Sequence, residues 1–168
     1  MDSVQSGGRA DARRRRRLTV AVREALRDMS VQLSLLNHRV SGRLELKGSD
    51  LECCELINRY GPLSPGELAQ RAGLHPATMT GVLDRLERGG WIARERDPAD
   101  RRAVSIRLLR DRNGEVLALY AGMNTAMDEI CAGYSEPELE LLAGFLRRTA
   151  DAGRSASHQL AEERRPRV

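Results

Sequence analysis

Hydrophobic side chains in residues 18–47 recur three or four residues apart, which is the spacing of one face of an α-helix. The stripe consists of Leu18, Val22, Leu26, Met29, Leu33, Leu36 and Val40. Gly42 and Gly48 lie at its end, so the pattern predicts a helix of about 25 residues. Because a small domain offers little apolar surface to cover so long a stripe, we expect this helix to pack against a second copy of the chain.

Two serines mark the starts of the next two helices. Ser49 is followed three residues later by Glu52, and Ser64 by Glu67, which is the spacing of a capping box. Gly73 ends the second of these helices, and another helix follows directly. Two short helices joined by a glycine-containing turn are the pattern of a helix-turn-helix.

The helix after this turn carries the positions that indicate a function. It begins at His75 or Pro76 and ends at Glu87, before two glycines. Its inward positions are the apolar residues Met79, Val82, Leu83 and Leu86. Its outward positions are Pro76, Ala77, Thr78, Thr80, Gly81, Asp84 and Arg85. Small and hydroxyl-bearing side chains let a helix approach base edges and phosphates in the major groove, and Arg85 can reach phosphate or guanine, so we expect this helix to bind DNA.

Two short strands are predicted next, at residues 91–96 and 103–109. In the second, apolar and polar side chains alternate, with Val104, Ile106 and Leu108 on one face. The loop at residues 97–102 contains aspartate, proline and two arginines, Arg101 and Arg102. Such a loop is often only a solvated turn. On a narrow ribbon, however, its arginines can enter a minor groove, and we expect that role here.

One combination of motifs extends over about residues 60 to 115. It consists of Met79, Thr80, Gly81, Val82, Leu83, Asp84, Arg85 and Leu86 in the helix that ends at Glu87, Gly90 and Trp91 after it, and Asp100, Arg101, Arg102 and Leu108 in the hairpin. This segment resembles the winged helix of the MarR family of transcriptional regulators. One departure is Gly81, which stands where the family often has arginine and so reduces the expected base readout.

The resemblance implies a mainly α-helical fold: a winged helix-turn-helix of three helices and a two-stranded β wing at residues 48–110. Long helices at residues 18–47 and 111–160 would form a dimerisation arm. The last two helices have apolar faces, formed by Val116, Tyr120, Met123, Met127, Ile130 and Cys131 and by Leu139, Leu142, Phe145 and Leu146. Their predicted caps are Asp111, and Ser135 with Glu138.

The resemblance also implies a homodimer that binds a palindromic operator in double-stranded DNA, with one recognition helix in each of two successive major grooves. Asp84 would form an ion pair with Arg102 that fixes the wing, which leaves Arg101 at its tip. Many relatives bind small aromatic compounds, so we expect a ligand- or stress-responsive repressor. The sequence identifies neither the effector nor its binding residues.

Charge and composition change this picture at the two ends. Residues 1–17 contain the run Arg13–Arg17 and only one sizeable apolar side chain, so we expect a disordered arm that either contacts phosphates or is simply solvated. Residues 161–168 are expected to form a polar tail. There is no apolar run of about 20 residues and no signal peptide, so we expect a cytoplasmic protein that does not bind membranes.

Other functions fit the sequence less well. Cys53 and Cys54 could sense oxidants, although adjacent helical residues point in different directions and buried structural thiols are the simpler interpretation. The three histidines are far apart in the sequence, so we expect no metal site. No cofactor or catalytic motif is present, which argues against an enzyme. A winged helix used only for protein contacts is the remaining alternative.

Overall fold

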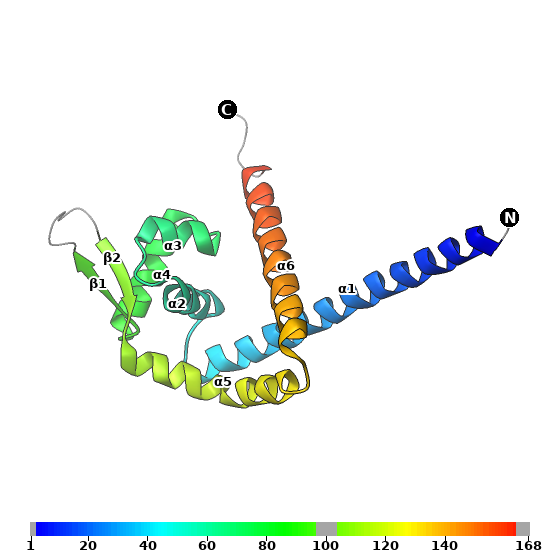
Figure 1. Cartoon of the computed structure of the whole chain (residues 1–168). Helices are drawn as coiled ribbons and strands as arrows, with labels where there is room; N and C mark the ends of the chain where they lie inside the picture. Colours follow the sequence, from blue (N-terminus) through cyan, green and yellow to red (C-terminus); the bar gives the residue numbers. More distant parts are fainter. Residues whose placement is uncertain (1–2, 97–103, 164–168) are drawn as a thin grey trace. The chain divides into compact units, whose positions relative to one another are not determined.

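α1 (Ser3–Arg43) is a single continuous helix of 41 residues. The computed structural model describes residues 3–96 and 104–163 (Figure 1). The chain divides into two units, residues 1–48 and 49–168, and α1 makes up nearly all of the first. After Arg43 the backbone turns at Glu45, which has a positive φ of 56°. The helix therefore ends slightly before the predicted boundary at residue 47.

The expectation of a disordered arm at residues 1–17 is wrong for residues 3–17, because they form the first four turns of α1. The expectation rested on the lack of apolar surface to bury, and the side chains of residues 9–17 are indeed all exposed. Alanine and arginine are nevertheless strong helix formers, and adding residues to an existing helix costs far less than starting one. The run Arg13–Arg17 therefore lies on a helix.

The second unit has the predicted winged-helix order. Its elements are α2 (Gly48–Tyr60), α3 (Pro65–Ala72), α4 (Pro76–Arg88), β1 (Ile92–Arg96), β2 (Val104–Leu108), α5 (Arg110–Cys131) and α6 (Glu136–Glu163) (Figure 1). The mainly α-helical fold class is thus confirmed, and the described residues contain one sheet, of two antiparallel strands.

Capping chemistry sets the ends of α3. Ser64 accepts a hydrogen bond from the Glu67 amide, and the Glu67 carboxylate accepts one from the Ser64 amide at 2.9 Å, so the predicted capping box is present. Gly73 ends the helix in the left-handed conformation, with φ of 64°, where a side chain would be strained. The turn between α3 and α4 is thereby fixed by residues visible in the sequence.

Two other predicted caps differ from the structure. The Ser49 hydroxyl donates to Asp50 instead of capping with Glu52, and α2 begins at Gly48. α5 begins at Arg110 with Leu109 as its N-cap residue, which makes no side-chain cap, so Asp111 lies inside the first turn. Asp111 still favours the helix there, because a negative charge near a helix N-terminus interacts well with the helix dipole.

The hydrophobic core of the second unit lies among α2, α3, α4 and the sheet. Its most buried side chains are Leu51, Ile57, Leu63, Leu68, Met79, Val82, Leu83, Leu86, Trp91, Ile92 and Ile106. β1 and β2 pair in an antiparallel register with Ile92 opposite Leu108. Leu63, from the segment between α2 and α3, adds a short bridge to Ile106. The sheet is thus joined directly to the helices that precede it.

Candidate nucleic-acid interface

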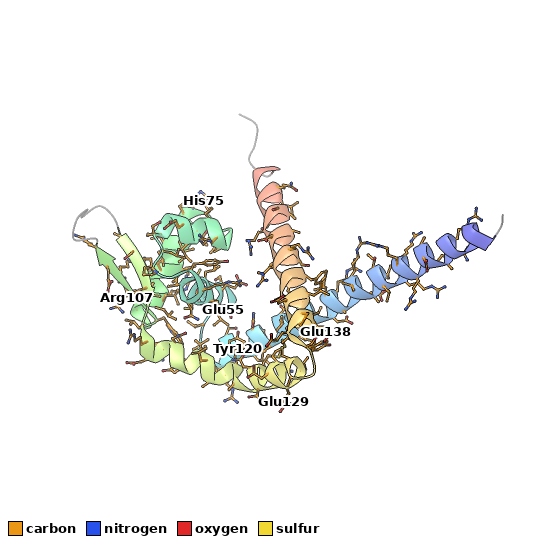
Figure 2. All side chains as sticks on the ribbon, viewed as in Figure 1. Glu55, His75, Arg107, Tyr120, Glu129 and Glu138 are labelled. Atoms are coloured by element: carbon orange, nitrogen blue, oxygen red, sulfur yellow. The ribbon has the colours of Figure 1, made fainter. Side chains whose placement is uncertain are left out.

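The N-terminal half of α4 presents a surface of small side chains. Ala77, Thr78 and Thr80 are exposed there, whereas Met79 between them is 1% exposed and belongs to the core. The His75 side chain caps the helix by accepting a hydrogen bond from the Ala77 amide at 3.3 Å (Figure 2). The core contact of Met79 therefore fixes which side of α4 faces solvent.

Three further residues keep the side chains on this surface short. The Thr80 hydroxyl donates to the Pro76 carbonyl at 3.2 Å, inside the helix, and its oxygen remains able to accept a hydrogen bond. Pro76 is exposed and Gly81 half-buried, and neither carries a long side chain. A duplex could therefore approach the backbone of α4 closely at Pro76, Ala77, Thr78, Thr80 and Gly81.

Arg85 has a different position from the one expected. Its guanidinium forms two hydrogen bonds to Asp50 of α2, at 3.0 Å from Nε and 2.7 Å from Nη2. The Asp50 side chain is 3% exposed and that of Arg85 is 35% exposed. A carboxylate as buried as this needs a partner, and a two-pronged arginine contact provides one. Arg85 therefore orients α4 against α2, while about a third of its side chain stays exposed.

Asp84 holds the wing through a residue that the sequence did not indicate. Arg94 of β1 donates to Asp84 at 2.5 Å and also pairs with Glu87 at 3.2 Å. Arg94 thus bridges two carboxylates on successive turns of α4. The expected partner, Arg102, lies outside the described residues, as does Arg101.

The C-terminal end of α4 is held by Arg112 of α5. The guanidinium of Arg112 lies 4.8 Å from the centre of the Trp91 ring and donates to the Gly89 carbonyl at 3.2 Å. A Cβ atom at Gly89 would come within 2.8 Å of the Trp91 ring, so this position requires glycine. Sequence reasoning missed Arg112 because it is 23 residues from the carbonyl that it contacts.

A polar contact joins α2 and α5 within the second unit. The Tyr120 hydroxyl donates to the Glu55 carboxylate at 3.0 Å, and the two side chains lie near one another in Figure 2. Burial raises the pKa of Glu55 above its usual value, and the hydrogen bond from Tyr120 partly opposes this shift. Burial and the nearby Glu55 carboxylate raise the pKa of Tyr120, so its proton stays on the hydroxyl and the contact persists at neutral pH.

The cysteines of α2 have the properties of structural thiols. Cys53 and Cys54 are both buried, and burial raises the pKa of Cys53 to about 11 and that of Cys54 to about 12. The thiolate is the form that reacts with oxidants, and it is scarce at neutral pH when the pKa is this high. Reactivity is thus suppressed at both positions.

Neither a metal-ligand cluster nor a membrane-spanning helix occurs among residues 3–96 and 104–163. No group of three or more histidine, cysteine or acidic side chains in this range could hold a metal ion. No helix in this range is both long and apolar enough to span a bilayer.

Known proteins with similar sequences and structures were then compared with the chain. The model of the MarR family matches residues 49–104. The HTH-type transcriptional regulator YcgE of Bacillus subtilis is 33% identical over 128 residues, which are 76% of this chain and 83% of YcgE.

Two solved structures share the fold. A MarR family protein from Bacillus stearothermophilus superimposes with a TM-score of 0.63 at 22% identity, over 81% of this chain and 95% of that protein. A mutant of MepR from S. aureus, bound to an oligodeoxyribonucleotide, gives a TM-score of 0.54 at 19% identity, over 76% of this chain and 94% of MepR. These similarities extend through the winged helix and into the long helices around it.

Proposed function

Because the chain belongs to the MarR family of DNA-binding transcriptional regulators, and its relatives are regulators and not enzymes, we propose that it represses transcription as a homodimer on a palindromic operator. The observation that carries this proposal is the exposed, short-side-chain surface at the start of α4. A recognition helix enters the major groove with its N-terminal residues against base edges. Thr78 and Thr80 supply hydroxyls at that end, and Ala77 can contact a thymine methyl group.

The dimer is supported by apolar side chains on the three long helices that remain uncovered in one chain. On α5 and α6 these are Leu117, Leu119, Met123, Met127, Ile130, Leu141, Leu142, Leu146 and Leu160. On α1, Leu18, Val22 and Met29 of the apolar stripe are also exposed. Exposed apolar surface of this extent normally marks an interface. A second copy, with the same helices, is the occupant that we propose.

The wing would add contacts beside those of α4. We propose that Arg101 enters the minor groove and that Arg102 supports the wing together with Arg94 and Asp84. Arg94 already connects β1 to α4, so wing and recognition helix would approach the duplex as one body. The MepR structure bound to an oligodeoxyribonucleotide supports DNA as the ligand of this fold.

Regulation would act through the spacing of the two recognition helices. A small aromatic effector that favours one separation of the helices would change operator affinity, since both helices must dock at once. A redox mechanism at Cys53 or Cys54 is disfavoured by the burial and raised pKa of both thiols. We therefore propose a ligand, not an oxidant, as the signal.

Half-site spacing tests the proposed dimer. Inserting five base pairs between the half-sites of an operator selected from a random duplex library should weaken binding about 100-fold, because the half-sites then face opposite sides of the duplex. The measurement is equilibrium binding by fluorescence anisotropy. An operator of the same length as the parent, with its spacer bases replaced, is the control and should bind as before. Equal affinity for the inserted and parent operators would show that one chain binds each half-site independently.

A further inference from the structure

The N-terminal part of α1 has two opposite faces. Arginines at Arg9, Arg13, Arg16, Arg23 and Arg27 repeat in steps of four and three, with Val20 completing the series. At 3.6 residues per turn these positions form one line along the helix, which we call the basic face. The apolar stripe that begins at Leu18 and Val22 lies on the opposite side of the same helix.

The basic face is fully available to a partner. All of its residues are exposed, and Arg13, Arg16 and Arg17 line one shallow depression with Val20, Ala21 and Glu24. Residues 9–27 contain eight arginines and two acidic residues, a formal charge of +6, although the whole chain carries only +4. Within residues 3–96 and 104–163, the arginines of the basic face form no ion pair. Positive charge is therefore concentrated here and not neutralised by the fold.

We propose that the basic face of α1 binds the phosphate backbone of duplex DNA without regard to sequence, as a contact separate from that of α4. The distance from Arg9 to Arg27 along the helix is about 27 Å, which equals about eight base pairs. Arginine suits this role because its guanidinium matches phosphate geometry with two donors. This inference rests on the proposed function for the nature of the ligand.

The apolar stripe on the opposite face of α1 explains why the arginines stay exposed to solvent. If the apolar stripe of α1 is covered by the second copy of the chain, the basic face is left in solvent. The apolar stripe contains leucines but no tryptophan or phenylalanine, and once a second copy covers it, no apolar face of α1 is left to insert into a membrane interface. The covered stripe thus favours DNA over a lipid surface.

A pair of double variants tests the proposal. Replacing Arg13 and Arg16 with glutamine removes two charges from the basic face. Replacing Arg14 and Arg15 removes two charges from the same run, but at positions off that face. Glutamine is a good helix former, so both variants should keep α1 intact, which circular dichroism would verify.

Binding is measured by anisotropy on an operator duplex of about 60 base pairs over a range of salt concentrations. Arg13→Gln with Arg16→Gln should weaken binding about tenfold at low salt and lower the salt slope by about two for each chain of the dimer whose basic face contacts the duplex, since each phosphate contact contributes about 0.9. Arg14→Gln with Arg15→Gln should change affinity less than about threefold. Equal losses in the two variants, or no loss in either, would overturn the proposal.

Two further measurements separate this inference from others. In the first, the loss of affinity in the Arg13 and Arg16 variant disappears on a duplex trimmed to the operator, which shows that the contact is with flanking DNA. In the second, the native protein captures a second labelled duplex and the variant does not, which shows that the contact is with another duplex. Either result supports the proposal. Arginine-dependent binding to vesicles of phosphatidylglycerol and phosphatidylcholine, without such dependence on DNA, would contradict it. Sequence-independent DNA binding that requires Arg13 and Arg16, in a protein with no preferred operator, would reject the proposed function while retaining this inference.

Discussion

Replacing Thr80 with glutamate should reduce operator binding more than 100-fold while leaving the fold and the dimer intact. Thr80 is exposed on α4, so the new carboxylate would disturb no core contact. On the proposed surface it would instead face phosphates and base-edge acceptors, with no counterion nearby in the groove, and like charges repel there. Anisotropy titration of the selected operator measures the loss, and sedimentation verifies the dimer.

Gln159→Glu is the matched control for this variant. Gln159 is exposed on α6 and the substitution changes the net charge by the same amount. It should alter operator affinity less than about threefold, as expected for a distant surface charge. If Thr80→Glu bound the operator like the native protein, α4 would not be the recognition helix.

Replacing Ile106 with alanine should lower the free energy of unfolding by about 3 kcal/mol. Ile106 is completely buried in β2, and its backbone exchanges hydrogen bonds with Leu63 at 2.7 and 3.1 Å. Its side chain therefore lies where the sheet meets the segment between α2 and α3. Truncation leaves a cavity that this rigid surrounding structure cannot readily close. Urea unfolding at fixed protein concentration measures the change.

Ile106→Val provides the internal control, because it removes a single methyl group. The expected loss is about 1 kcal/mol, so the two variants should form a graded series. Equal stability of the native, valine and alanine proteins would show that the β2 side chain does not contribute to the core as the structure describes.

Local signals in the sequence were sufficient to predict most of the fold. The capping box at Ser64 and Glu67 and the glycine at Gly73 act on neighbouring backbone groups, so their effect could be predicted from spacing alone. The two faces of α4 followed from helical periodicity, and Met79 is buried while Thr78 and Thr80 are exposed, as predicted. Such features depend on residues only a few positions apart.

The contacts that orient the candidate interface could not be predicted in this way. Asp50 and Arg85 are 35 residues apart in the sequence, and only the packing of α2 on α4 brings them together. Arg94 begins a run of three charged residues at the end of β1, and nothing local distinguishes it as the partner of Asp84. Long-range ion pairs are determined by tertiary structure, so sequence reasoning, which expected Arg85 to contact DNA, did not reveal its ion pair with Asp50.

The error at residues 3–17 has a different origin. Burial of apolar surface is a reliable sign of order in a domain, but a helix can be extended by residues that bury nothing when their helix propensity is high. Because these residues are helical, each arginine of the run lies on a defined side of α1, which the expectation of disorder could not indicate. Arg13 and Arg16 lie on the basic face, and Arg15 lies on the opposite side.

Equilibrium titration of the native protein with DNA from upstream of its own gene, at several salt concentrations, tests most directly whether residues 49–110 read DNA. A scrambled duplex of equal length and composition provides the reference. The upstream DNA should bind at least about 1,000-fold more tightly than the scrambled duplex, and affinity for both should fall log-linearly as salt rises. Equal affinity for the two duplexes, or binding that does not respond to salt, would contradict the assignment of this fold as a sequence-specific DNA reader.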